Sequence, residues 1–283
     1  MTNDAKINNT KLNNAKLNNA KLNNAKINDK TPLPIGGAPS SALRPLFSRF
    51  GVLVLAVGVV IAFFVTQLIG IYFAGRLLLP AVDALTVGDI FFLGSVDGTI
   101  VSSSILISCV LLTLLMTAIV RVKAGDVRQY LALHSFSWLI AAAMIGVLVL
   151  FMLGSQIVTY WLDKTPLDFV DPLYQSVDSV WLLVVAMVIV APIYEELVFR
   201  GLLWSAISEQ FSEPRGAITA SIVTSIIFAV IHLQYGLYEI TTIMLLALIF
   251  CYARLKSGSV LLPILLHIIN NGVAMGQYLM QVN

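Results

Sequence analysis

The chain has 283 residues, of which 58% are hydrophobic and only 11% are charged, with a formal net charge of +2. A soluble globular domain carries about twice that share of charged residues, so this composition excludes a soluble protein. It predicts an all-α, multi-pass integral membrane protein whose surroundings are the lipid bilayer. The total charge gives no sign of a nucleic-acid partner, and none is expected. In such a protein the positions of Lys and Arg carry more information than their sum.

The first 41 residues are predicted to form a disordered tail and linker. A five-residue repeat runs from Ala5-Lys-Ile-Asn-Asn to Ala25-Lys-Ile-Asn-Asp29. It resembles the pentapeptide repeats of four-sided β-helices, but so few copies could not bury a stacked core. Its period also fits no helix, and Asn is a poor helix former. No cleaved signal peptide is expected, because the first apolar run begins near residue 50 and is long enough to span a bilayer.

Seven apolar runs follow the tail, and each is interpreted as a spanning helix because its length excludes a strand. The fourth is expected to continue past Arg200 to Phe211. Only Glu239 and the turn Gln234-Tyr235-Gly236 separate the fifth run from the sixth. The runs cover residues 50–75, 99–120, 136–154, about 180–200, 217–237, 238–253 and 259–280.

The distribution of Lys and Arg predicts the orientation of these helices. If the N-terminus is cytoplasmic, every Lys and Arg except Arg76 and Lys164 lies on the cytoplasmic side. The loops that hold those two residues are instead rich in Asp. An excess of Lys and Arg in short loops marks the cytoplasmic side. We therefore predict a cytoplasmic N-terminus and an external C-terminus, in the cytoplasmic membrane if the protein is bacterial.

Three ionisable side chains interrupt the fourth apolar run. An ionisable group at membrane depth is unfavourable unless it is paired, so such residues mark functional sites. Glu196 and Arg200 stand at i and i+4 with the acid first, which predicts an ion pair. Glu195 points about 100° away from Glu196 on a helix and needs a different partner or role. Pro192 removes a backbone donor and is expected to bend the helix near Glu195.

Three further polar residues lie on later apolar runs, namely His232, His267 and Asn271. Each histidine by itself is typical of a hydrogen bond between helices. A rise of about 1.5 Å per residue, however, puts Glu195 and these three residues at comparable depths in the membrane. His267 and Asn271 are one turn apart on one helix face. The sequence therefore predicts that the four side chains share one site.

The remaining histidine and the two cysteines are not assigned to this site. His134 lies in a loop without a polar companion and is predicted to be solvated or interfacial. Cys109 and Cys251 fall inside apolar runs and are predicted to be small core residues without a disulfide or a metal.

Carboxylate, imidazole and amide groups in one site favour hydrolysis. Glu195 and His232 can share a water molecule and act on it as general base and then general acid. His267 and Asn271 can donate hydrogen bonds to the oxygen of a tetrahedral intermediate. No serine or cysteine nucleophile is needed.

Zinc is the alternative, because Glu195, His232 and His267 would form a His₂Glu ligand set with an open position. The sequence lacks the H-E-x-x-H motif, and Asn271 stands where a zinc protease of that type would present its second histidine. Asn is a poor zinc ligand, so a mechanism without a metal cofactor is preferred.

Three motifs, in this order on successive apolar helices, resemble those of the CPBP family of intramembrane proteases, which includes the type II CAAX prenyl proteases: Glu195-Glu196-x-x-x-Arg200-Gly201, Phe228-x-x-x-His232 and His267-x-x-x-Asn271. The resemblance covers roughly residues 178–280. It implies an endopeptidase in which Glu195 and His232 activate water while His267 and Asn271 stabilise the oxyanion. Glu196, Arg200 and Phe228 would support these residues. Members of the family have also been called metalloproteases.

We therefore predict an intramembrane endopeptidase that acts on a membrane-associated protein or peptide. Residues 1–41 would be a dispensable tail, residues 42–177 N-terminal transmembrane helices and residues 178–283 the catalytic domain. Two other functions would also place these residues in a membrane protein. A proton-coupled transporter would hold Glu and His inside the bilayer, although the repeats and paired broken helices typical of transporters are not found. A non-catalytic immunity or scaffold protein of the same family would tolerate loss of Glu195.

Overall fold

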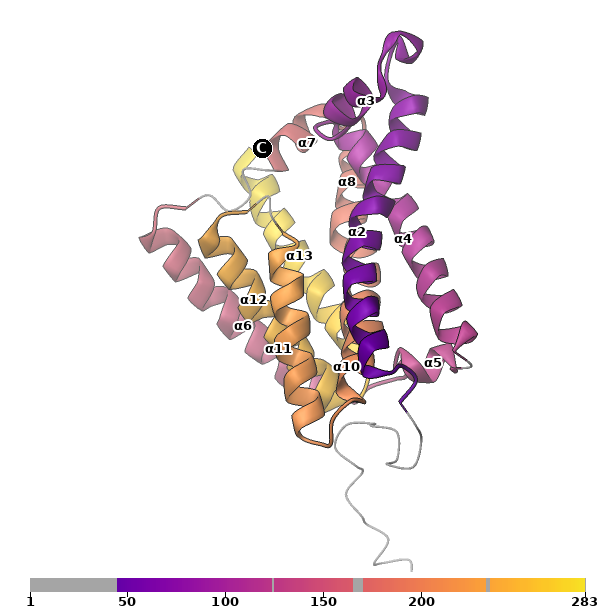
Figure 1. Cartoon of the computed structure of the whole chain (residues 1–283). Helices are drawn as coiled ribbons and strands as arrows, with labels where there is room; N and C mark the ends of the chain where they lie inside the picture. The colour runs from indigo at the N-terminus through magenta and orange to yellow at the C-terminus, as the bar shows by residue number, and fades with distance from the viewer. Residues whose placement is uncertain (1–44, 124, 165–169, 233–234, 283) are drawn as a thin grey trace, which may run out of the picture. The chain divides into compact units, whose positions relative to one another are not determined.

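The computed structural model describes residues 45–123, 125–164, 170–232 and 235–282. The predicted tail, residues 1–41, lies outside the described residues. The regular structure in the described part is helical throughout, so the all-α prediction is confirmed (Figure 1).

The N-terminal half begins with two long helices that pack along each other, α2 (Arg49–Leu78) and α4 (Gly98–Val122). They approach each other closely at Gly70, where an added Cβ would lie 2.8 Å from backbone atoms of Ser104. Gln67 donates from Nε2 to the Ser104 Oγ at 2.7 Å in the same contact. A small residue in one helix thus lets polar groups of the other come within hydrogen-bond reach.

Shorter helices that the apolar runs did not predict occupy the connections. The Thr86 hydroxyl and the Asp89 carboxylate form a reciprocal capping box that starts α3 (Val87–Gly94). These helices and the third long one are η1 (Val82–Ala84), α3 (Val87–Gly94), α5 (Val127–Tyr130), α6 (Trp138–Trp161) and α7 (Val170–Ser176).

Val180–Ser208 forms one continuous helix. It extends past Arg200, as predicted. Two of its stretches have the wider π-helical hydrogen-bond pattern; the Ala191 N–H, for example, donates to the carbonyl of Ala186, five residues back. Pro192 has no N–H to donate and is the second residue after the first of these stretches, which ends at Val190. The successive segments are α8 (Val180–Val184), η2 (Val185–Val190), α9 (Ala191–Glu196), η3 (Leu197–Leu203) and α10 (Trp204–Ser208).

Three helices complete the fold: α11 (Arg215–Val230), α12 (Leu237–Ser257) and α13 (Leu261–Val282). The fifth run was predicted to be helical to residue 237, but α11 ends at Val230. The reason is local, because the His232 N–H turns back to the carbonyl of Ala229 and its side chain bonds the carbonyl of Phe228. Gly258, with a φ of 69°, ends α12 in the left-handed conformation.

The largest cluster of buried apolar side chains centres on Val180–Ser208. Phe199, Leu202 and Leu203 are fully buried there. Residues of α2, α4, α11 and α12 pack around them. The helix that carries the three ionisable residues is therefore the one that the others surround.

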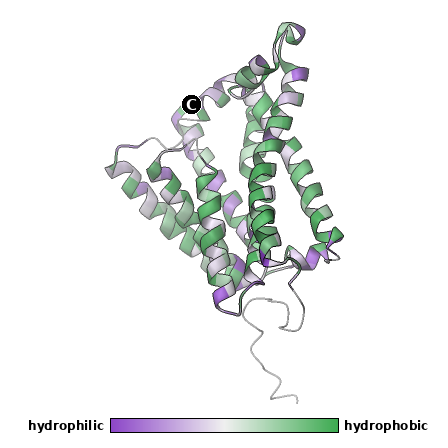
Figure 2. Cartoon of the chain, in the orientation of Figure 1, coloured by the Kyte–Doolittle hydropathy of each residue, from purple (hydrophilic) through white to green (hydrophobic). Residues whose placement is uncertain are grey.

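Five helices of the described residues are long and apolar enough to cross a membrane, and Figure 2 shows apolar residues along the bodies of the helices. The protein is therefore an integral membrane protein with an all-α polytopic bundle. Helix α11 is shorter than a span, and α13 is not among the five. The total of seven crossings and the cytoplasmic N-terminus stay predictions. The helices that qualify are α2, α4, α6, Val180–Ser208 and α12.

Candidate active site

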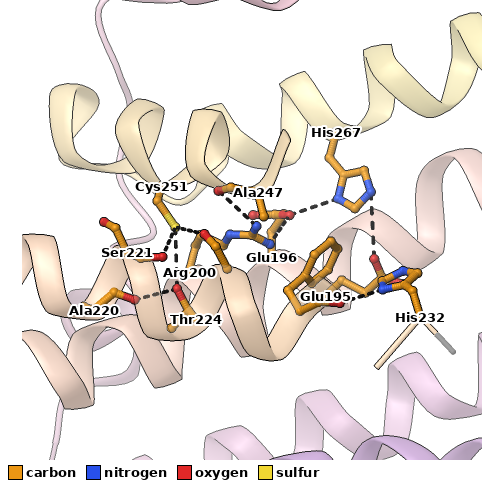
Figure 3. Close-up of polar contacts among 12 residues, drawn as sticks. Glu195, Glu196, Arg200, Ala220, Ser221, Thr224, His232, Ala247, Cys251 and His267 are labelled. Atoms are coloured by element: carbon orange, nitrogen blue, oxygen red, sulfur yellow. Dashed lines mark hydrogen bonds and ion pairs between the residues drawn. The ribbon is translucent and has the colours of Figure 1, made fainter. Parts of the chain in front are cut away.

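A fully buried ion pair forms the centre of the site. Arg200 donates from Nη1 to Oε1 of Glu196 at 2.8 Å, and neither side chain is exposed. The predicted pair is therefore present (Figure 3). A second donor of the guanidinium, Nη2, bonds the carbonyl of Ala247 on α12 at 3.3 Å. The guanidinium also lies over the rings of Phe228 and Phe250, 4.5 and 5.5 Å from their centroids, so several elements hold it in place.

His267 joins this pair from α13. Its Nδ1 is 2.9 Å from the same Oε1 of Glu196. A carboxylate oxygen accepts, so Nδ1 carries the proton and the ring orientation is fixed. The other ring nitrogen, Nε2, faces Oε2 of Glu195 at 3.8 Å. The two glutamates therefore contact opposite sides of one imidazole.

Glu195 is only 8% exposed, and its carboxylate points toward His267 (Figure 3). The distance of 3.8 Å between Oε2 of Glu195 and Nε2 of His267 is too long for a direct hydrogen bond. A polar contact of this length suits a bridging water that bonds both groups. The one-residue phase difference between the two acids thus gives them different partners, since Glu196 contacts Arg200 and Nδ1 of His267 while Glu195 faces Nε2 of His267.

His232 lies just beyond α11, next to the same cluster. The Phe228 carbonyl can only accept, so the 2.7 Å contact with Nδ1 places the proton there and leaves Nε2 as an acceptor in the neutral ring. The His232 and Phe228 rings are 4.8 Å apart between centroids, and the Phe228 ring is also 6.0 Å from His267. Within the described residues, Glu195 has an ion-pair contact with His267 and none with His232.

Asn271 is held by the π-helical stretch before Pro192. Its Nδ2 donates to the carbonyl of Met187 at 3.1 Å, and its Oδ1 accepts from Asn270. In an i to i−5 pattern, Met187 would receive the N–H of residue 192, which is a proline and has none. Asn271 therefore satisfies the carbonyl that Pro192 leaves without a donor, and this bond ties α13 to η2.

The zinc alternative requires Glu195, His232 and His267 to converge on one point. In the described part of the chain, no group of three or more His, Cys, Asp or Glu side chains is arranged to hold a metal ion. The bond from Nδ1 of His267 to Glu196 does not oppose zinc, because a metal-bound imidazole commonly donates its other N–H to a carboxylate. His232, however, does not lie within ion-pair distance of Glu195. The three side chains as they stand therefore do not converge on one point.

His134 and Cys251 lie in their predicted environments, exposed and buried respectively, whereas Cys109, predicted to be a core residue, is only half-buried. His134 is exposed, and its backbone carbonyl accepts from the Ser259 hydroxyl. Cys109 and Cys251 are both free, and Cys251 is buried against Thr224 and Ser225.

Sequence reasoning missed several members of the site. The contact between His267 and Glu196 was not predicted, since Glu196 already had Arg200 as a partner. The Ala247 carbonyl and the Phe250 ring carry no motif that could reveal them. Met187 could have been found, because it lies five residues before Pro192, but only if a π-helical pattern had been assumed.

The similarity to known proteins covers the part of the chain that holds the site. Residues 177–273 match the family model described as Type II CAAX prenyl endopeptidase Rce1-like. An Escherichia coli protein described as an uncharacterized 24.3 kDa protein is 31% identical over 133 residues, which is 46% of this chain and 58% of that protein. The chain thus matches a little over half the length of that relative. No solved structure matches significantly. The resemblance inferred from the motifs is confirmed over residues 177–273.

Proposed function

We propose that this chain, whose residues 177–273 match the Rce1-like type II CAAX prenyl endopeptidases, is an intramembrane endopeptidase. The observation that carries the proposal is the 3.8 Å approach of the Glu195 carboxylate to the His267 imidazole inside a buried polar cluster. If the cluster were only a structural ion pair, one acid would be enough. Glu196 pairs with Arg200, so Glu195 is a second acid that remains available for catalysis.

The proposed reaction uses water as the nucleophile. Glu195 accepts a proton from a water molecule while the oxygen of that water attacks the carbonyl carbon of the substrate peptide bond. The carbonyl oxygen becomes an oxyanion. When the C–N bond breaks, Glu195 returns the proton to the leaving nitrogen, and the products are a carboxylic acid and an amine.

The histidines and Asn271 have supporting roles in this scheme. The neutral His232 presents Nε2 as an acceptor, which suits a second base beside Glu195. His267 in its protonated form donates from Nε2 toward the oxyanion while Glu196 holds Nδ1. Asn271 has a second amide N–H besides the one that bonds the Met187 carbonyl, and we assign this second N–H to the oxyanion.

The substrate class follows from the location of the site. Glu196 and Arg200 are fully buried on a candidate spanning helix, so the scissile bond must enter the bundle from the membrane or its edge. We propose a membrane-associated protein or peptide as the substrate. We also propose that the chain crosses the membrane several times and lies in the cytoplasmic membrane of a bacterium.

The decisive experiment compares membranes that contain the wild-type protein with membranes that contain Glu195→Ala, using proteomics of protein termini. New termini that require Glu195 are expected, and they would name the substrate. Asp83→Asn, at a side chain that is 96% exposed, is the matched control and should produce the wild-type pattern. If both samples give the same termini across the membrane proteome, the peptidase proposal fails.

A second experiment decides between the two accounts of water activation. Activity of purified enzyme is expected to survive a chelator, because Glu195 takes the proton without a metal. A zinc enzyme would lose its turnover on chelation and regain it on addition of Zn²⁺. Stoichiometric zinc that disappears in His232→Ala would replace our mechanism with the metal-dependent one.

A further inference from the structure

Arg254 is a buried guanidinium without an acidic partner. It lies on α12 and is only 4% exposed. Among the residues that the structure describes, no carboxylate lies within ion-pair distance of it, and no acceptor takes a hydrogen bond from its side chain. Its Nε is enclosed and has no partner, which is also true of the Nε of Arg200. A guanidinium has five N–H donors, and a buried charge without a partner is strongly unfavourable.

Arg200 is a buried arginine whose charge is compensated by groups of the protein itself, and it provides a comparison for Arg254. That side chain has a carboxylate at 2.8 Å, a backbone carbonyl at 3.3 Å and two aromatic rings. Arg254 has the Trp204 ring, 5.0 Å from its Cζ, and none of the others. Trp204 is itself fixed, because its Nε1 donates to the Ser221 hydroxyl. The ring orients the guanidinium but does not neutralise it.

The open side of the guanidinium is its outer edge. Nε is the one donor of Arg254 that is both enclosed and without a partner, so the two Nη atoms face the side from which an acceptor can approach. Two Nη groups in one plane match two oxygens of a phosphate or a carboxylate. The side chain is thus oriented by Trp204 and presents a fork to an anion.

The depth of Arg254 identifies the anion. It lies three residues before the end of the candidate spanning helix α12 at Ser257, about 4.5 Å along the axis. The end of a spanning helix is at the level of the lipid headgroups. Lys256, exposed at the same helix end, adds positive charge. Basic pockets between helices at this level suit the phosphates of anionic lipids.

We propose that Arg254, oriented by the Trp204 ring of α10, binds the phosphate of an anionic phospholipid at the end of α12. The lipid supplies the negative charge that the protein lacks there. Such a lipid would be a structural ligand of the bundle, separate from the polar cluster around Glu196. The proposal does not depend on the peptidase activity.

The test uses the full chain in a nonionic detergent with short-chain phosphatidylglycerol as the probe. The thermal unfolding temperature of the wild-type protein is expected to rise with phosphatidylglycerol and to change little with phosphatidylcholine of equal chain length. Arg254→Met should weaken the apparent affinity about tenfold or more, as for loss of a charge-assisted hydrogen bond. Lys256→Met, which removes an exposed cation from the same helix end, should weaken it by no more than about twofold.

In Arg254→Met, the unfolding temperature measured without lipid is expected to rise although the affinity for lipid falls. Arg254→Met replaces an uncompensated buried charge with an apolar side chain and should raise that temperature. A role limited to packing on Trp204 would lower it and would overturn the proposal, as would equal losses of affinity in the Met variants of Arg254 and Lys256. Equal stabilisation by inorganic phosphate would overturn the choice of a lipid.

Arg254→Lys decides the question if the Met variant does not fold. Lysine keeps the charge but lacks the planar fork, so its affinity for phosphatidylglycerol should be about threefold lower or worse. Native mass spectrometry then counts the lipids that remain bound. An unchanged lipid count and an unchanged affinity in this variant would overturn the proposal.

Discussion

Two spanning helices of this protein, α2 and Val180–Ser208, are both strongly apolar but lie in different surroundings. In the most apolar 18-residue window of Val180–Ser208, 56% of the residues are buried inside the protein, against 17% in α2. Helix α2 turns Phe50, Leu53 and Phe73 outward. Val180–Ser208 instead carries the buried Glu196 and Arg200.

The difference teaches that hydropathy identifies a membrane helix but does not say what surrounds it. A side chain that faces lipid and one that faces another helix are equally apolar. What marks the central helix is its polar residues, because only the interior of the bundle offers them partners. Substitutions in the two helices should therefore differ most at polar positions in the centre.

The largest effect is expected at Glu195. Glu195→Gln should lower kcat/KM by about three orders of magnitude or more, because a neutral amide cannot accept the proton of the water. Initial rates on a peptide substrate identified from its new termini give the measurement. The unfolding temperature should change little, since the ion-pair contact of Glu195 with His267 is 3.8 Å long and is not a direct hydrogen bond. A variant with activity near the wild-type value would show that Glu195 is not the base.

The next effect concerns stability. Glu196→Gln should destabilise the fold by about 3–5 kcal/mol, because it leaves Arg200 charged and buried without its acid. Asp83→Asn is the control, since the ion pair of Asp83 with Arg76 has an N–O distance of 3.6 Å and is exposed. It should cost less than about 1 kcal/mol. Unfolding in mild detergent, followed by circular dichroism, compares the two variants. Equal losses would mean that burial does not distinguish these pairs.

Asn271 links the site to the backbone of the central helix. Asn271→Ala should lower kcat by about 10²- to 10³-fold, as for removal of one oxyanion donor. It should also destabilise the fold by about 1–3 kcal/mol, because the Met187 carbonyl loses its donor. Rates and unfolding measured on the same preparation separate the two contributions. A loss of stability with unchanged kcat would restrict Asn271 to a positioning role.

The smallest effects are expected in α2, where two glycines form a matched pair. Gly70→Ala should cost about 1–3 kcal/mol, because its Cβ would lie 2.8 Å from backbone atoms of Ser104. Gly58→Ala meets nothing within 4 Å and should change stability by less than about 1 kcal/mol. Unfolding in detergent provides the comparison. A tolerant Gly70 would show that α2 and α4 can move apart.

The sequence predicted the class of the fold and the ion pair, because both depend on local patterns. Apolar runs of about 20 residues specify spanning helices, and an i, i+4 acid and base on one helix can pair without knowledge of other elements. The end of α11 was wrong by seven residues, since the turn at His232 depends on a side-chain bond to Phe228. Helix ends are set by such bonds rather than by hydropathy.

The partners of Glu195 were harder to predict. Estimates of depth placed His232 closer to the level of Glu195 than His267, but they contain no information on how the helices rotate about their axes. Rotation decides that His267 rather than His232 comes within 3.8 Å of Glu195. The unpaired Arg254 could not be recognised either, because burial at the end of a helix depends on Trp204, which lies 50 positions earlier in the chain.

The two π-helical stretches, η2 and η3, have a consequence for the comparison of this chain with its relatives. A turn closed from residue i to i−5 contains one residue more than an α-helical turn, so each stretch is equivalent to a single-residue insertion in an α-helix. A relative whose helix is α-helical throughout would align only with a one-residue gap within 185–190 and another within 197–203. Without either gap, every position beyond that stretch would be rotated by about 100°, and lipid-facing residues would be equated with buried ones. Alignments that forbid gaps inside membrane helices would therefore misplace Glu195 or the residues that precede it.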